Sequence, residues 1–145
     1  VHCNAGSSAA YYVARKNNIT QLCNYIETHS NGNAVLLMGD FNCRYTRIDD
    51  NIRKIDSLGF KNVWVELLRN NINPIQDGNS LMDCSPNATN ATCEVVDKIF
   101  YRSSDKIHLN ATHYQLDDTA FYDSDGESLS DHRPMFANFQ YVVLK

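Results

Sequence analysis

The sequence predicts an α/β domain, with a mixed β-sheet and flanking helices, from three features of its hydrophobic pattern. Apolar residues recur at helical spacing over residues 9–28. A continuous apolar run covers residues 34–38, which is typical of a strand buried on both faces. The C-terminal third has the alternating pattern of several successive strands. A strand, a long helix, a second strand, short helices and then a series of strands indicate the α/β class.

The N-terminal quarter is expected to form a strand end, a turn and the long helix. Residues 1–4 have a β-type pattern, and the Ala-Gly-Ser-Ser turn at 5–8 offers serines that cap helices. Between the apolar positions of the helix, such as Leu22 and Ile26, lie charged residues that favour a solvent-facing side. Ser-Asn-Gly-Asn at 30–33 ends this helix before the buried strand begins.

The rest of the chain is expected to alternate short elements with loops. The helix that starts at residue 50 is expected to end at Gly59, which caps it. A long loop such as the one that starts at Asn70 often carries function. The expected elements are short helices at 50–58 and 63–68, a loop at 70–93, strands at 95–101, 107–115 and 135–143, and a tight turn at 123–126.

The composition suits one folded domain, with 145 residues, 43% hydrophobic residues and a net charge of −4. No run of 18 or more apolar residues occurs, so no membrane-spanning helix is predicted. The acidic balance argues against a protein that coats nucleic acid, but it permits an enzyme that contacts a few phosphates through a metal. The first residues, Val-His-Cys-Asn, form no signal peptide, so we expect the chain to begin inside a domain or after a processing cut.

The cysteines and asparagines favour a secreted, N-glycosylated protein. Five cysteines show no zinc-ligand spacing, and Cys84 and Cys93 are expected to form a disulfide, which leaves one unpaired thiol or a bond outside the chain. With 17 Asn and 7 Thr, chance alone gives about 0.8 Asn-x-Thr triplets. The alternative to N-glycosylation is that sequons arose by chance in an Asn-rich chain. Four sequons occur, at Asn18, Asn87, Asn90 and Asn110.

The first candidate site follows the buried strand directly. Asp40 and Asn42, in Gly-Asp-Phe-Asn, lie two residues apart at the carboxyl end of that strand, where α/β folds place ligands. The carboxylate suits a hard cation or a water molecule, and the amide suits a phosphate oxygen. The alternative is that both residues only build the turn that leaves the strand.

Three further positions offer complementary chemistry. Asp131 and His132, in Ser-Asp-His, pair a possible metal ligand with a general acid or base just before the last strand. Asp97 lies inside an apolar strand, where a charge needs a partner, and an imidazolium would supply one. The alternatives are a pairing with Lys98 or a position on an exposed edge of the sheet. His2 ends the opening strand and, considered alone, has the pattern of a structural or exposed histidine.

Together, His2, Gly-Asp-Phe-Asn, Val-Asp-Lys-Ile and Ser-Asp-His occur in the order and approximate spacing of one family. The chain resembles the endonuclease/exonuclease/phosphatase superfamily, whose members include DNase I-like deoxyribonucleases and neutral sphingomyelinases. The stretches at 101–103 and 123–126 resemble a secreted branch of it. The resemblance implies half of a four-layer, DNase I-like α/β sandwich, with residues 1–145 forming the C-terminal half of one domain.

The resemblance also implies a role for each motif residue. Asp40 would orient the attacking water or approach the metal, and Asn42 would hold the scissile phosphate. Asp131 would help to bind Mg²⁺, with Mn²⁺ or Ca²⁺ as alternatives. His132 would contact the phosphate and shuttle protons while Asp97 orients its ring. His2 would lie on the other side of the phosphate, and the reaction would be an in-line attack of water on a phosphodiester.

The family's N-terminal half supplies a metal-binding Glu, a phosphate-side Asn and a Glu that pairs with the first histidine, and none precedes Val1. A single sheet would leave one apolar face bare, so we expect an N-terminal segment or another subunit to cover it. Arg44 follows the motif and could contact a phosphate backbone, or it could cover the start of a surface helix.

Two functional hypotheses therefore follow from the sequence. The first is a secreted, metal-dependent phosphodiester hydrolase, with nucleic acid favoured over phospholipid as the substrate. The second is a secreted glycoprotein that keeps the fold for assembly or binding, with catalysis incomplete or lost.

Overall fold

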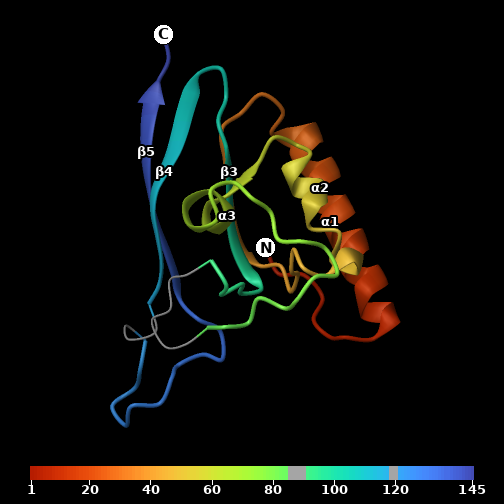
Figure 1. Cartoon of the computed structure of the whole chain (residues 1–145). Coiled ribbons are helices and arrows are strands. Elements are labelled where there is room, and N and C mark those ends of the chain that lie inside the picture. The colour runs from red at the N-terminus through yellow and green to blue at the C-terminus, as the bar shows by residue number, and fades with distance from the viewer. Residues whose placement is uncertain (85–90, 118–120) are drawn as a thin grey trace.

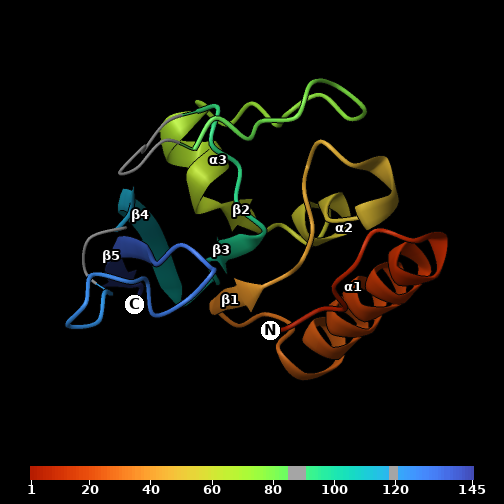
Figure 2. The ribbon, with the colours of Figure 1, turned by 90° about the horizontal axis from the view of Figure 1, so that it is seen from below.

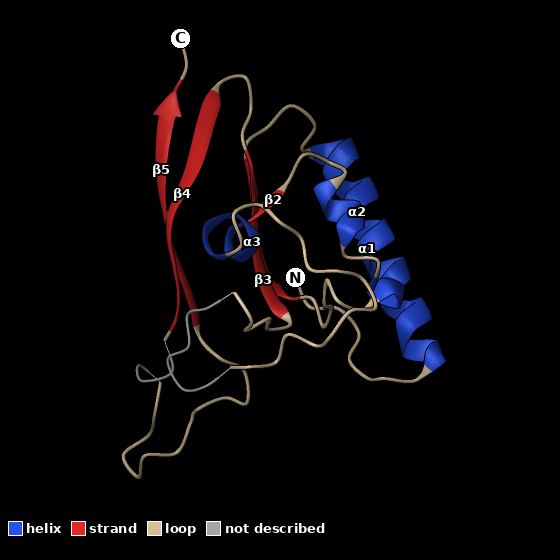
Figure 3. Cartoon of the chain, in the orientation of Figure 1, coloured by secondary structure: helices blue, strands red, loops and turns tan. Residues whose placement is uncertain are grey.

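The computed structural model describes residues 1–84, 91–117 and 121–145, and its helices and strands form successive layers (Figures 1 and 3). Seen from below in Figure 2, α1 and α2 lie on one side of a three-stranded sheet, while α3 and the β4–β5 hairpin lie on the other. The elements are α1 (Ala9–His29), β1 (Val35–Asp40), the 3-10 turn η1 (Ile48–Asp50), α2 (Arg53–Asp56), β2 (Lys61–Asn62), α3 (Val63–Leu68), β3 (Asp97–Arg102), β4 (Ile107–Leu116) and β5 (Met135–Val143).

The three-stranded sheet has the order β1-β3-β2, and both pairs of strands are antiparallel. A parallel bridge between His2 and Asp40 extends the pairing along the outer edge of β1, which makes the arrangement mixed. The register pairs Asp40, the last residue of β1, with Asp97, the first residue of β3. The antiparallel register therefore brings three chain segments to one end of the sheet.

The core lies between this sheet and the two helices on one side of it. Leu37 and Phe100 are cross-strand partners that face α1 and α2, and Phe41 packs edge-on against Phe100 with ring centroids 5.3 Å apart. The helices contribute fully or almost fully buried side chains because their apolar positions recur at helical spacing. These side chains are Ile19, Cys23 and Ile26 from α1 and Ile55 from α2.

The β4–β5 hairpin packs on the opposite side through its inward-facing residues. Tyr114 and Leu116 of β4 are buried, and Phe139 of β5 contacts Tyr101 of β3 edge-on with ring centroids 5.4 Å apart. The register shifts between Ala111 and His113, which is a bulge in the ladder. The hairpin therefore covers β3 while leaving β1 further from any partner layer (Figure 2).

The strand predicted to be buried on both faces is buried on only one. Leu37 is 8% exposed, but its neighbours Leu36 and Met38 are 45% and 54% exposed. Successive side chains of a strand point to opposite faces, and only the face toward the helices is covered at β1 in the part of the chain that the structure describes. The prediction for residues 34–38 was therefore wrong for Leu36 and Met38.

The other elements follow the predicted pattern with local differences. The residues of α3 and β5 match their predicted ranges, and the opening strand is reduced to the single bridge at His2. The helix predicted for 50–58 is divided into η1 and α2 because Asn51 adopts a left-handed conformation with φ of 55°. Gly59 follows α2 with φ of 79°, which agrees with its predicted capping role.

No helix among the described residues is long and apolar enough to cross a membrane. The predicted disulfide between Cys84 and Cys93 is present, while Cys3, Cys23 and Cys43 are buried free thiols. The turn at 123–126 is also present, closed by a hydrogen bond from the amide of Gly126 to the carbonyl of Asp123.

Candidate active site

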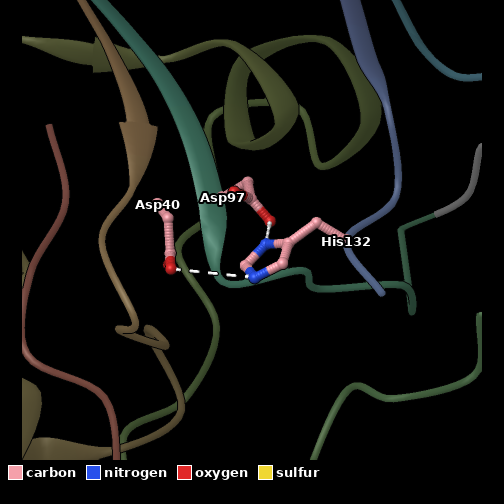
Figure 4. A group of neighbouring side chains, drawn as sticks. All are labelled: Asp40, Asp97 and His132. Carbon is pink, nitrogen blue, oxygen red and sulfur yellow. Dashed lines mark hydrogen bonds and ion pairs between the residues drawn. The ribbon is translucent and has the colours of Figure 1, made fainter. Parts of the chain in front are cut away.

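Asp40, Asp97 and His132 meet where β1 ends and β3 begins (Figure 4). The Nδ1 atom of His132 lies 2.8 Å from the Oδ2 atom of Asp97, and its Nε2 atom lies 3.8 Å from the Oδ2 atom of Asp40. The two carboxylates come from adjacent strands and the imidazole comes from the loop before β5. An imidazole held between two carboxylates is suited to proton transfer and to binding an anion.

Asp40 is held in place by the backbone turn that follows it. The amide nitrogen of Asn42 donates to Oδ1 of Asp40 at 2.7 Å, and the side-chain amide of Asn42 donates to Oδ2 at 2.7 Å. That side chain also donates to the carbonyl of Cys3 at 2.9 Å. Because both partners are acceptors, the nitrogen of the side-chain amide must face them. Asn42 therefore orients the Asp40 carboxylate, with both of its donor hydrogens in use.

His2 approaches the same carboxylate from the opposite edge of β1. Its Nε2 atom lies 3.5 Å from Oδ2 of Asp40, and its side chain is largely exposed. The amide of Cys3 donates to the carbonyl of Asp40, which fixes the chain next to His2. A Cβ atom at Gly39 would lie 2.1 Å from the carbonyl oxygen of Val1, so only glycine allows this close approach.

The surroundings of His132 favour its cationic form. The hydrogen bond to Asp97 and the charge of that carboxylate raise the pKa of His132 above its ordinary value, and the charges of Asp40 and Asp131 act in the same direction. Partial burial opposes this rise without cancelling it. The imidazole can therefore keep a proton at Nε2, facing Asp40, while Nδ1 donates to Asp97.

The donor atoms at this site fit a divalent cation in part. Asp40, Asp97 and His132 each offer one ligand atom, and these atoms lie within 4.8 Å of one another. Asp40 accepts from Asn42 through both carboxylate oxygens, and Asp97 accepts from His132 through Oδ2. A bound cation would share these oxygens with their present donors. Asp131 is exposed beside His132, outside this cluster of three. Oxygen donors from Asp40 and Asp131 match the preference of Mg²⁺ for carboxylate ligands.

Two cavities flank the loop that carries Asp131 and His132. One, of about 360 Å³, is lined by both residues together with Asn42, Arg44 and Asp97. The other, of about 280 Å³, is lined by the same loop and by two aromatic side chains that were not predicted as site residues, Phe121 and Tyr122. The aromatic pair in a loop near Ser-Asp-His is the sequence signal for this second cavity.

The remaining predicted residues lie in varied surroundings. Arg44 is partly buried in the first cavity and donates to the carbonyl of Glu94. Asn18 lies within α1, where its side-chain oxygen accepts from the amide of Asn4, and Asn110 is exposed on β4. The sequons at Asn87 and Asn90 lie outside the described residues.

Comparison with known proteins identifies the family of the chain. A family model described as "Endonuclease/Exonuclease/phosphatase family 2" matches residues 1–138. The chain belongs to this family. The predicted DNase I-like α/β class is confirmed by a solved structure of a humanized D. rerio TDP2 carrying 14 mutations, with a TM-score of 0.58 and 17% identity.

Curated relatives extend the match at the sequence level. Proteins named sphingomyelinase from Mycobacterium bovis and from two strains of Mycobacterium tuberculosis are 34% identical over 128 residues. The chain spans 24% of the length of these relatives, although 87% of the chain is matched. It covers 49% of the TDP2 chain, with 94% of its own residues matched.

Proposed function

We propose that the chain is the C-terminal half of a divalent-metal-dependent phosphodiester hydrolase, a secreted nuclease. The observation that carries the proposal is the position of the His132 ring, which lies between the carboxylates of Asp97 and Asp40. His2 approaches the same Oδ2 atom of Asp40. Two imidazoles around one carboxylate supply both a proton acceptor and proton donors at one point. Membership in the family supports hydrolysis of phosphate esters.

The chain's own residues have distinct parts in this proposal. The water oxygen forms a bond to phosphorus while the bond to the leaving alcohol oxygen breaks. Asp40 orients the water and accepts its proton, and His132 gives its Nε2 proton to the leaving oxygen. Asp97 keeps the His132 ring oriented and stabilises its cationic form. His2 contacts the phosphate from the other side of Asp40.

Asp40 and Asp131 are the residues that would hold the cation, for which we propose Mg²⁺, with Mn²⁺ or Ca²⁺ as alternatives. The bound cation would neutralise the negative charge that develops on the phosphate oxygens. Two carboxylates leave most of the coordination positions of Mg²⁺ to water, to the phosphate and to groups outside this chain.

Nucleic acid is the proposed substrate class because of the cavity beside Asp97. Arg44 and Asn42 line this cavity next to the catalytic His132, and a guanidinium suits a second phosphate of a polymer backbone. Asn42 has both side-chain donor hydrogens in use, so its contact with the scissile phosphate would replace its bond to Asp40 or to Cys3. Because the curated relatives are named sphingomyelinases, sphingomyelin is the alternative substrate to test.

An N-terminal segment or another subunit is proposed to complete the domain. Leu36 and Met38 of β1 leave an apolar surface exposed, and Tyr141 and Val143 of β5 are also exposed. The chain covers about half of the structurally similar TDP2 chain. That segment or subunit would also supply further ligands to a metal held by Asp40 and Asp131.

Secretion and N-glycosylation are supported by local features. The disulfide between Cys84 and Cys93 is typical of an oxidising compartment. Asn110 is exposed on β4, where its side chain is accessible for an N-linked glycan.

The decisive experiment measures hydrolysis of DNA, RNA and sphingomyelin by the full-length protein from its natural open reading frame, with Mg²⁺ or with EDTA. We expect Mg²⁺-dependent cleavage that falls by about a hundredfold or more in Asp40→Asn and His132→Ala, since each removes a proton-transfer group. Asp123→Asn and His113→Ala, both on exposed side chains away from the cluster, are the matched controls. Unchanged cleavage in the double variant of Asp40 and His132 would disprove the proposal.

The second candidate function is a glycoprotein that uses the fold for assembly. The exposed apolar side chains of β1 and β5 favour it, because they could be buried between subunits. Sedimentation and imaging of the full-length protein separate the two functions. An inactive oligomer with these side chains in its interface supports assembly, and an active monomer excludes it.

A further inference from the structure

A fully buried carboxylate lies behind the candidate active site. Asp50, the last residue of η1, has its Oδ1 atom 2.9 Å from Nε of Arg15 and its Oδ2 atom 2.7 Å from Nε of Arg47. The amide nitrogen of Arg44 donates to the same Oδ2 atom at 2.8 Å. One carboxylate therefore joins α1 to the loop that leaves Asp40.

The first connection leads from Asp50 to Asn42. Arg47 lies beside the Asp50 carboxylate and donates from Nη2 to the carbonyl oxygen of Asn42 at 2.9 Å. Asn42 has φ of 50°, a left-handed conformation that asparagine adopts more readily than most residues. The Arg47 contact fixes the peptide that follows Asn42, and the side chain of Asn42 in turn orients Asp40.

The second connection leads from Asp50 to the segment that follows His2. Arg15 is fully buried and donates from Nη1 to the carbonyl oxygens of Asn4 and Gly6. The neighbouring Cys3 accepts from Asn42 and donates to the carbonyl of Asp40. Asp50 is therefore linked to both segments that flank the Asp40 carboxylate.

Stability alone does not account for this arrangement. Taking a carboxylate and a guanidinium out of water costs about as much as their attraction returns, and apolar residues of similar size would pack at least as well. Hydrogen bonds between charged groups are directional, however, and a guanidinium can bridge two acceptors in a fixed geometry. Arg15 donates to Asp50 and to the carbonyls of Asn4 and Gly6. Arg47 is paired with Asp50 by charge and donates to the carbonyl of Asn42. The two guanidiniums therefore fix where Asn42 and residues 4–6 lie.

We propose that Asp50, acting through Arg47 and Arg15, is the positioning residue of the active site and sets the placement of Asn42 and His2 around Asp40. The inference rests on the proposed phosphodiester hydrolysis. Asp50 touches neither the substrate nor the reacting atoms; it holds the backbone of the residues that do.

The experiment uses Arg47, because loss of Asp50 or Arg15 would leave a buried charge without its partner. Arg47 is 32% exposed. In the full-length protein, Arg47→Ala is expected to lower kcat by about tenfold to a hundredfold, since small displacements of reacting groups are costly. KM is expected to change by less than about threefold, because the lost interaction does not contact substrate. Arg47→Lys should not restore kcat, because an ammonium cannot bridge Asp50 and the Asn42 carbonyl in the same geometry.

Arg102 provides the matched control. It also donates to two backbone carbonyls, those of Leu58 and Ser30, but it lies at the end of β3 opposite Asp97. Arg102→Ala should leave kcat unchanged. Added guanidinium ion should restore part of the activity of Arg47→Ala, because a small cation can occupy the vacated position between Asp50 and Asn42.

Two outcomes would overturn the inference: wild-type kcat in a folded Arg47→Ala variant, or full restoration by Arg47→Lys. Hydrogen exchange measured by mass spectrometry provides a readout independent of activity. Amide exchange over residues 42–47 should accelerate in Arg47→Ala and not in Arg102→Ala, and unchanged exchange contradicts the inference. If the wild-type protein cleaves no phosphodiester, the proposed function fails, and the exchange result alone decides whether Asp50 positions this loop.

Discussion

At the scale of single residues, His132 is the most informative group. Its pKa is raised by the hydrogen bond to Asp97 and by the surrounding carboxylates. Because the pKa is higher in the folded state, protonated His132 stabilises the fold fully below its unfolded pKa of about 6.5. This contribution is lost as the pH rises through the raised folded pKa. The imidazole is 40% exposed, so solvent screening limits the stabilisation.

We expect Asp97→Asn to lower the pKa of His132, because the variant removes the charge and the strongest acceptor. Nuclear magnetic resonance titration of the His132 ring protons in the full-length protein measures the midpoint directly. His113 lies on the outer face of the hairpin against Phe136, and its ring resonances serve as the internal chemical-shift reference. An unchanged or higher midpoint for His132 would contradict the assignment of Asp97 as its partner.

At the scale of elements, the loop after β1 is held from two sides. The amide of Arg44 donates to Asp50, and the next amide, that of Tyr45, donates to the buried carboxylate of Glu94 at 2.6 Å. Glu94 is paired with Lys98 of β3 at 3.1 Å. Burial lowers the pKa of Lys98, and the Glu94 carboxylate opposes this shift. Two buried ion pairs therefore attach the loop to α1 and to β3.

The element in which a sequon lies also decides how accessible its asparagine is. We expect Asn110, exposed on β4, to carry a glycan in a larger fraction of molecules than Asn18. Asn18 is half-buried in α1 and accepts from the amide of Asn4. Mass spectrometry of glycopeptides from the full-length protein, expressed through a eukaryotic secretory pathway, measures the two occupancies. Equal occupancy, or higher occupancy at Asn18, would contradict this expectation.

At the scale of the whole molecule, the covered and uncovered faces of the sheet differ. Leu36 lies opposite Tyr101 in the β1–β3 register, and Tyr101 contacts Phe139 of the hairpin. Leu36 therefore shares a face with the inner side of the hairpin, where Tyr141 is 70% exposed. This surface is where a completing segment would pack.

Aspartate substitutions in the full-length protein test that arrangement. Leu36→Asp is expected to lower the free energy of unfolding by about 3–5 kcal/mol, since the completing segment would bury an unpaired carboxylate. Val142→Asp is the control, because Val142 is similarly exposed but points to the outer face of β5. It should cost about 0.5 kcal/mol or less, as is usual for surface positions. Chemical denaturation measures both values, and equal costs would argue against a covering segment at β1.

Much of the local structure was predictable because it depends on neighbours along the chain. The spacing of apolar residues predicted α3 and β5 with their observed ranges, and the nine-residue separation of Cys84 and Cys93 predicted their disulfide. An imidazole partner was one of the alternatives for Asp97, and the structure places His132 there. The break at Asn51 was not predicted, because a single left-handed residue leaves little trace in hydrophobic spacing.

The sequence by itself determined the order of the elements and the residue types that carry the chemistry, because both are written in short-range spacing. Only the tertiary structure decided that Asp50 joins Arg15 to Arg47, since Arg15 lies 35 residues away along the chain. It also decided that Leu36 and Met38 remain exposed. Alternation along a strand specifies which side chains share a face, but what covers that face depends on segments brought there by folding.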